Sequence, residues 1–248
     1  MKNFEGLVSI LREFEKKYEA HHHLLPTPDR RMQYSEAIAM YFEPCAAKIL
    51  AGHFLVTNTE GEKSVVRIIQ PTAIELYYHE EGEGRFKDPI MYHTNDRKVS
   101  YNKDYFDARG IEGLPYYPIG SLNPHTSGID VTFENAKEHY RASFLIREYT
   151  VKYEGGVEQF VKNSTDIYDD LLLNGIPIDD ADWVEWCEGE PIHHDQIERR
   201  WRRNVADYTE VSPGKWEKND LVEGRDCFTL GGIKYVKCPF NWQFRGKQ

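Results

Sequence analysis

Glu75 and Tyr77 lie two residues apart in a run rich in Ile, Leu and Tyr, and this pair is the first candidate for chemistry. On a β-strand, residues two apart project from the same face, so a carboxylate and an aromatic ring would share one surface. Ile74 and Leu76 would then face the core. Such a surface can line a pocket in which the carboxylate acts as a general base on water. The alternative is an ordinary half-exposed strand.

The elements that must position this pair are predicted by residue type and periodicity. Two β-rich runs, Val65–Ile69 and Ala73–Tyr78, are separated by a segment containing Pro71, which marks an edge or a bend. Upstream, Gln33–Tyr41 and Pro44–Ala51 read as helices, with Ser35 as a cap and Pro44 in a first turn. The strand His53–Asn58 and a turn then lead back antiparallel into the first β-rich run.

The rest of the chain alternates helix and strand signals. The periodicity predicts an amphipathic helix over Asn3–Tyr18 and strands over Ile129–Phe133, Ala142–Val151, Cys227–Leu230 and Lys234–Val236. Further helices are expected at Gly156–Asn163, Thr165–Asn174, Asp180–Glu188 and His194–Val205, and residues 97–118 read as a long loop. No internal repeat or low-complexity linker is found, so one α+β domain is the economical prediction.

Composition limits the class of protein. The 248 residues are 40% hydrophobic and 29% charged, which is typical of a globular domain with a substantial core. No apolar run approaches 18 residues and the first 20 residues lack a signal-peptide core, so we expect a cytoplasmic protein without a membrane partner. The four cysteines lack zinc-finger spacing. The net charge of −10 disfavours nucleic-acid partners unless basic residues are segregated.

The order of several short motifs resembles the alkyladenine (methylpurine) DNA glycosylase family. The resemblance covers roughly residues 40–246 and rests on shared order, because each motif is short. The motifs are AAKILAGHFLV at Ala46–Val56, VRIIQPTAIELYYHE at Val66–Glu80, MYHT at Met91–Thr94, GSLNPHTSGIDVTFEN at Gly120–Asn135, FLIRE at Phe144–Glu148 and NWQFRG at Asn241–Gly246.

The resemblance implies a fold and an activity. The fold is a single mixed α+β domain with a curved antiparallel sheet and peripheral helices, placed at residues 29–248, with residues 1–28 as a helix and linker packed on it. The activity is monofunctional excision of alkylated purines from DNA by base flipping. By residue match, Glu75 would activate the water, and Tyr77 and His93 would stack on the base. The family's intercalating aromatic has no counterpart around Gly128–Val131.

Other residues complete the expected site. His125, Asp130 and Arg147 are candidates for substrate binding, since they lie in or beside the matching strands. The run IERRWRRN at Ile197–Asn204 is the concentrated source of cations for DNA phosphates. Its candidate nucleic-acid-binding residues are Arg199, Arg200, Arg202 and Arg203. The alternative is a solvated helix face paired with acidic residues. No cofactor and no metal are expected, and no feature indicates a protein partner.

Three other functions stay open. His93, His125 and Asp130 could hold a metal that activates water for hydrolysis. Glu75 and Asp130 could flank a sugar bond as the two carboxylates of a glycosidase. The chain could also be a diverged relative that binds a nucleoside, another small molecule or a partner without DNA activity. Convergence of Glu75, Tyr77 and His93 on one cleft would favour the DNA glycosylase.

Overall fold

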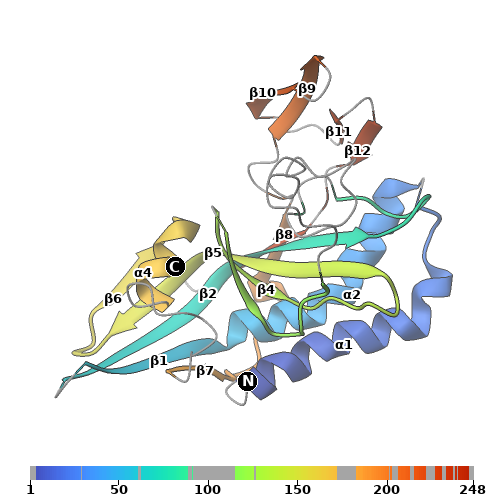
Figure 1. Cartoon of the computed structure of the whole chain (residues 1–248). Helices are drawn as coiled ribbons and strands as arrows, with labels where there is room; N and C mark the ends of the chain where they lie inside the picture. The colour runs from blue at the N-terminus through green and yellow to red at the C-terminus, as the bar shows by residue number, and fades with distance from the viewer. Residues whose placement is uncertain are drawn as a thin grey trace.

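The chain folds as one mixed α+β unit around a curled antiparallel sheet, seen here in a computed structural model (Figure 1). Two long helices, α1 (Glu5–His21) and α2 (Arg31–Ala51), open the chain, with the short helix η2 (His22–Leu24) between them. The structure describes residues 4–28, 30–60, 63–88, 91, 115–125, 127–171, 183–200, 202, 206–212, 215–221, 227–230, 233–236, 238 and 240–245.

The main sheet is organised around one long strand, β2 (Lys63–Glu80). One edge of β2 pairs with β5 (Tyr140–Tyr153) along almost its whole length. The other edge pairs first with β1 (His53–Glu60) and then with β13 (Asn241–Phe244), the last described strand of the chain. The remaining strands of this sheet extend it on either side: β3 (Leu122–His125), β4 (Gly128–Thr132), β6 (Glu158–Val161), β7 (Val184–Cys187) and β8 (Ile197–Arg200).

Strand alternation divides the sheet into an apolar face and a polar face. Ile74, Leu76 and Tyr78 of β2 face the helices, whereas Glu75 and Tyr77 project from the opposite face. The helix side is closed by aromatic packing: Phe42 of α2 lies 5.1 Å from Trp242 and 5.5 Å from Phe133 between ring centroids. Each fully buried aromatic ring of this kind contributes about 1.5–3 kcal/mol to stability.

The two helices form a layer that runs along one side of the sheet (Figure 1). They pack on each other through Phe14 and Phe42, whose centroids are 6.2 Å apart, and the Cys45 thiol donates to the Ile10 carbonyl at 3.2 Å. Pro44 lies inside α2 and not at a helix start. A proline has no N–H for the carbonyl four residues earlier. That carbonyl, on Met40, instead accepts from Lys17 Nζ of α1 at 3.2 Å.

A second buried carboxylate ties the helices to the sheet. Glu80, near the end of β2, is 1% exposed and faces the helix layer. One of its oxygens, Oε1, accepts from three tyrosine hydroxyls: Tyr18 of α1 at 2.9 Å, Tyr34 of α2, and Tyr78 of β2 at 2.7 Å. The other oxygen accepts from the Phe86 backbone N–H at 3.3 Å. Three elements therefore depend on one side chain for their hydrogen bonds.

The structure corrects several expected elements. The two helices expected over Gln33–Ala51 are one continuous helix, and Ser35 lies within it. The two β-rich runs around Pro71 are one continuous strand, β2. Three expected helices are wrong, because long-range strand pairing overrides local propensity there. Gly156–Asn163 contains strand β6, Asp180–Glu188 contains strand β7, and His194–Val205 contains the short helix η5 (His194–Gln196) followed by strand β8.

Short elements complete the fold. Helices η3 (Ser164–Asp166) and α4 (Ile167–Leu171) follow β6, and two hairpins lie away from the main sheet (Figure 1). The hairpins are β9 (Ala206–Ser212) with β10 (Lys215–Leu221), and β11 (Cys227–Leu230) with β12 (Ile233–Val236). The second hairpin contains the two strands expected near the end of the chain. Among the described helices, none combines the length and apolarity needed to span a membrane.

Candidate active site on the polar face of the sheet

The polar face of the sheet carries a row of side chains contributed by six strands. Residues directly opposite one another in neighbouring strands share a face. The register therefore aligns one residue from each of β3, β4, β5, β2, β13 and β8 across this face, in the order Asn123, Asp130, Leu145, Glu75, Asn241 and Arg200. Glu75, Asp130 and Asn241 are almost completely buried, so the middle of this row is shielded from solvent, whereas Arg200 at its end is exposed.

Glu75 is the centre of this row and is 0% exposed. Arg147 grips it with two hydrogen bonds: Nη2 lies 2.8 Å from Oε1 and Nε lies 3.2 Å from Oε2. Tyr77 donates its hydroxyl to Oε1 at 3.0 Å, and that hydroxyl oxygen accepts from Arg147 Nη2 at 2.8 Å. Bidentate contacts of this kind between arginine and a carboxylate are among the strong hydrogen bonds in proteins.

Two register shifts place Arg147 against Glu75. Pro71 pairs with Tyr149 and Ala73 pairs with Glu148, so Thr72 is an extra residue in β2. Ala73 and Ile74 then pair with Glu148 and Ile146, so Arg147 is an extra residue in β5. A bulged residue has no partner across the strand pair, and bulges re-aim side chains beside active sites. Arg147 can therefore lean over the neighbouring strand onto Glu75.

Charges and burial set the protonation states in this cluster. Burial raises the pKa of the Tyr77 phenol, and the neighbouring Glu75 and Asp130 carboxylates raise it further, so Tyr77 stays a neutral donor. Burial opposes the charge of Arg147, yet the nearby Tyr77 and Glu75 groups raise its pKa above the usual value. Arg147 therefore stays a cation beside Glu75.

His125 of β3 and Asp130 of β4 meet on the far side of β5 from Glu75. His125 Nε2 lies 3.0 Å from Asp130 Oδ1, and Ser143 donates to Asp130 Oδ2 at 3.0 Å. The Ser127 N–H points at His125 Nδ1 at 3.3 Å, which assigns the ring proton to Nε2, facing Asp130. No group of three metal-ligating side chains is found within the described ranges.

A third ion pair lies behind Tyr77. Arg202 donates to both oxygens of Asp88, at 2.6 and 3.1 Å, and both side chains are buried. The Arg202 guanidinium lies over the Tyr77 ring at 5.2 Å and over the Phe240 ring at 5.8 Å. Tyr77 also packs in a small cluster with Met91 and Leu145, and it is 5% exposed. A face of its ring is therefore occupied by a protein cation.

The expected arginine helix is instead a strand whose arginines have acidic partners. Arg199 bridges to Glu36 at 2.8 Å and Glu43 at 3.3 Å, both on α2. Arg200 pairs with Glu198 of the same strand. Arg202 is buried and is also paired with a carboxylate. Acidic partners for these arginines are what the alternative to phosphate binding predicts. Arg203 and His93 lie outside the described residues, so their expected roles stay predictions.

Sequence reasoning missed three side chains that complete the site: Asp88, Ser143 and Asn241. Ser143 and Asn241 each interrupt an apolar run, and that interruption is the signal that could have indicated them. Asp88 follows the turn after β2 and carried no such signal. The structure brings Glu75, Tyr77 and Arg147 together and places His125 with Asp130 on the same face, two strands from Glu75.

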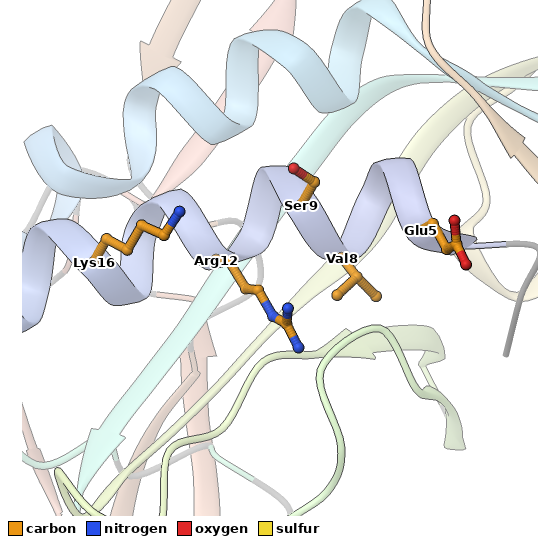
Figure 2. Close-up of a pocket in the computed structure, with 5 residues that line it drawn as sticks. All are labelled: Glu5, Val8, Ser9, Arg12 and Lys16. Carbon is orange, nitrogen blue, oxygen red and sulfur yellow. The ribbon is translucent and has the colours of Figure 1, made fainter.

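A separate hollow lies on the surface of α1, in the helix layer. Its volume is about 420 Å³, and it is lined by Glu5, Val8, Ser9, Arg12 and Lys16. Figure 2 shows Val8 and Arg12 projecting from one side of the helix and Ser9 from another. The hollow contains none of the polar-face residues, so it is not part of the candidate active site.

Comparison with protein-family models, with curated proteins and with solved structures finds no match for this chain.

Proposed function

We propose that this protein hydrolyses N-glycosidic bonds, with Glu75 activating a water molecule and an alkylated purine in DNA as the first substrate to test. The observation that carries the proposal is the Glu75 carboxylate, buried on the polar face and held by Arg147 and Tyr77. A carboxylate held in one orientation can act as a general base on a water within hydrogen-bond reach. The motif order that resembles the methylpurine glycosylases supports the choice of bond.

The reaction needs no cofactor. Glu75 takes a proton from the water as its oxygen bonds to the anomeric carbon. The bond between that carbon and the base nitrogen breaks, and its electron pair leaves with the base. An alkylated purine carries positive charge in the nucleotide, so it departs neutral. The cation Arg147 holds the Glu75 carboxylate in one orientation throughout, which keeps the water aligned.

The Tyr77 hydroxyl helps to position the Glu75 carboxylate. The hydroxyl bonds both Glu75 and Arg147, so it fixes the carboxylate from a second direction. The stacking role implied by the resemblance would use whatever ring surface Arg202 leaves open, together with His93. The Asp130 carboxylate, in contact with His125, adds negative charge to the same face. Such a charge favours a cationic base over a neutral one.

A free nucleoside is the second candidate substrate. The net charge of the chain is −10, and Arg199, Arg200 and Arg202 are each paired with a carboxylate. Binding to duplex DNA requires cationic side chains that can contact phosphates in place of their carboxylate partners. A nucleoside carries no phosphate, so the paired arginines would not limit its binding.

The test is base release, measured by chromatography, from methylated duplex DNA and from methylated purine nucleosides. We expect free methylpurine from one substrate, and a loss of at least 100-fold in Glu75→Gln, since general-base catalysis contributes about 10²–10⁴-fold. Glu80→Gln is the matched control, because Glu80 lies on the same strand but faces the helices. Equal activity of wild type and Glu75→Gln, or no release from either substrate, would refute the proposal.

A further inference from the structure

Strand β6 has one edge that no other described strand joins. Its other edge pairs with β5, from Glu158 opposite Lys152 to Val161 opposite Tyr149. In Figure 1, β6 lies along the outer border of the main sheet. An unpaired strand edge presents a row of backbone N–H and C=O groups that a further strand can join.

The hydrogen bonds of the β5–β6 hairpin identify which backbone groups point outward. The Tyr153 N–H donates to the Val157 carbonyl at 2.8 Å, beside the turn between the two strands. In an antiparallel pair, only alternate residues bond to the neighbouring strand. The residues two and four positions after Val157 therefore bond to β5, whereas the N–H and C=O groups of Glu158 and Phe160 point away from it.

The side chains along this edge place an aromatic ring between two opposite charges. Phe160 is 48% exposed, and Glu158 and Lys162 on either side of it are also exposed. Neither charged side chain forms a salt bridge in the described part of the chain. Lys162 Nζ lies 5.6 Å from the centre of the Phe160 ring, so these two side chains lie on the same side of the strand.

Helix α4 covers the opposite face of this hairpin. Tyr149, the register partner of Val161, donates to Asp170 of α4 at 2.7 Å. Neighbouring residues of a strand project from opposite faces, so Phe160 lies on the face that α4 leaves open. The edge and the ring are therefore both accessible to a second molecule.

We propose that β6 is a dimerisation edge, which pairs antiparallel with β6 of a second copy of this chain about a two-fold axis at Phe160. The axis sets Phe160 against its own copy. It also sets Glu158 of each copy opposite Lys162 of the other, so two ion pairs flank the two rings. Such an interface is isologous, because the same patch serves both copies. This inference does not rest on the proposed function.

The signs of the two charges favour self-pairing in this one register. Charged side chains often protect a strand edge from association. Two like charges at equal distances from Phe160 would repel their own copies here, whereas Glu158 and Lys162 attract theirs. Moving the axis by one residue in either direction would set the Phe160 ring opposite a charged side chain and would separate both ion pairs.

The first experiment is sedimentation velocity of the wild-type protein. Because β6 is four residues long, the interface is small, and we expect a reversible dimer with a dissociation constant of about 100 μM or less. The sedimentation coefficient should therefore rise from the monomer value toward the dimer value between about 10 and 500 μM. A monomer at the highest concentration would overturn the inference and would indicate that the charges protect the edge.

The second experiment tests the register by charge reversal. Glu158→Lys sets lysine opposite lysine in its own dimer, and Lys162→Glu sets glutamate opposite glutamate. We expect each variant alone to dimerise about tenfold more weakly than the wild type or worse, since attraction becomes repulsion at two pairs. An equimolar mixture restores both ion pairs, so it should dimerise within about threefold of the wild type. A mixture that associates no better than its components would overturn the proposed pairing.

Matched controls separate this effect from a change in net charge. Glu185 on β7 and Lys16 on α1 are exposed, and β7 forms the opposite end of the main sheet. Glu185→Lys and Lys16→Glu change the net charge by the same amounts as the two edge variants. We expect each to dimerise like the wild type. An equal loss in these controls would assign the effect to net charge and would overturn the inference.

The third experiment is a cross-link across the two-fold axis. In the proposed register the two copies of residue 160 have Cα atoms about 5.5 Å apart, a distance that a disulfide spans. The two copies of residue 157 are about 20 Å apart. Mild oxidation should therefore give a covalent dimer in Phe160→Cys but only the wild-type background in Val157→Cys. Cross-linking of Val157→Cys instead, or of neither variant, would contradict the two-fold axis at Phe160.

Discussion

The contact between Glu75 and Arg147 is a buried ion pair at the centre of the candidate site. The Glu75 side chain is 0% exposed and that of Arg147 is 13% exposed, so little water screens either charge. Burying two charges costs desolvation energy that their attraction only offsets when the geometry is good. Removing one partner leaves the other charge buried without compensation, and this asymmetry makes the pair testable by mutation.

We expect Arg147→Met to lower the free energy of unfolding by about 3–5 kcal/mol, because it removes the cation that is paired with the buried Glu75 carboxylate. The double variant Glu75→Gln/Arg147→Met should regain part of this loss, since no unpaired charge remains. Urea unfolding followed by circular dichroism measures both. Arg199→Met is the control: its pairs with Glu36 and Glu43 are partly exposed, so about 0–1 kcal/mol is expected. Equal losses in the two single variants would contradict the buried-pair account.

Sequence reasoning at the residue scale works for neighbours and fails across strands. Strand alternation alone predicts that Glu75 and Tyr77 share a face, and the hydrogen bond between them is in line with this. The hydrogen bond from Arg147 to Glu75 joins residues 72 apart, and the hydrogen bond from Asn241 to Glu75 joins residues 166 apart. Neither separation can be read from periodicity, and the bulge that re-aims Arg147 leaves no clear pattern in residue type.

At the scale of elements, Glu80 joins α1, α2 and β2 through Tyr18, Tyr34 and Tyr78. Each hydroxyl is buried in the helix layer, so it has no water to replace a lost acceptor. The three tyrosine hydroxyls therefore all depend on the Glu80 carboxylate as their acceptor. A change at Glu80 should act on the docking of both helices, whereas a change at Tyr18 or at Tyr34 should act on one helix.

We expect Glu80→Ala to lower the free energy of unfolding by about 3 kcal/mol or more, because it leaves three buried donors without their acceptor at about 1–3 kcal/mol each. Tyr18→Phe removes one donor and leaves Glu80 with two others, so about 1 kcal/mol is expected. Denaturant unfolding at neutral pH gives both values. A loss in Glu80→Ala no larger than that in Tyr18→Phe would show that the cluster does not act as a unit.

The elements that sequence predicts correctly are those whose signals are local. The helix over α1 and the strands within β1, β4 and β5 follow from hydrophobic periodicity. The run around Arg199 was misread, because Arg favours helices in isolation. Its strand, β8, forms by pairing with β13, which lies about 40 residues later in the chain. Tertiary pairing of this kind overrides local propensity.

At the scale of the whole molecule, the pairing of β2 with β13, the last described strand, places Asn241 beside Glu75 and completes the site. Residues 241–244 must reach an edge of β2 that β1 already occupies in part. The helix and strand signals predicted one α+β domain, and the resemblance implied an antiparallel sheet; both are confirmed at that coarse level. The insertion of β13 between β2 and β8 was not predictable, since any of the strand-like runs could have filled that edge.

The buried tyrosines predict a steep loss of stability in alkali. Burial raises the pKa of each of six phenols above the ordinary value of about 10, and nearby carboxylates or other phenols add to the shift; these are Tyr18, Tyr34, Tyr77, Tyr78, Tyr140 and Tyr149. A raised folded-state pKa means that stability is fully present below pH 10 and falls as the pH rises, when phenols ionise only in the unfolded chain.

We expect the free energy of unfolding to fall by about 8 kcal/mol per pH unit above pH 10, since each such phenol contributes about 1.4 kcal/mol per unit. Tyrosinate absorbance and circular dichroism should therefore change together in one sharp transition. Tyr34→Phe removes one of these phenols, so its slope should be shallower by about one proton. Gradual tyrosine ionisation without loss of secondary structure would contradict the assignment of these hydroxyls to the core.

The distribution of charge also predicts how any DNA binding depends on salt. Each phosphate contact with a free cation releases counterions, so affinity falls with salt in proportion to the number of such contacts. The net charge is −10, and Arg199 and Arg200 already have carboxylate partners. Few cations on β8 are therefore available to replace counterions on a duplex.

We expect the affinity for a duplex oligonucleotide to fall by only about tenfold between 50 and 200 mM salt, the change that about two phosphate contacts produce. Fluorescence anisotropy measures this slope directly. Arg199→Gln should leave the slope unchanged, because its guanidinium is held by Glu36 and Glu43 and has no free charge to offer. A fall of 10³ or more would require a strongly basic surface contributed by other residues. A flat response together with release of methylpurine from nucleosides would establish the nucleoside as the substrate.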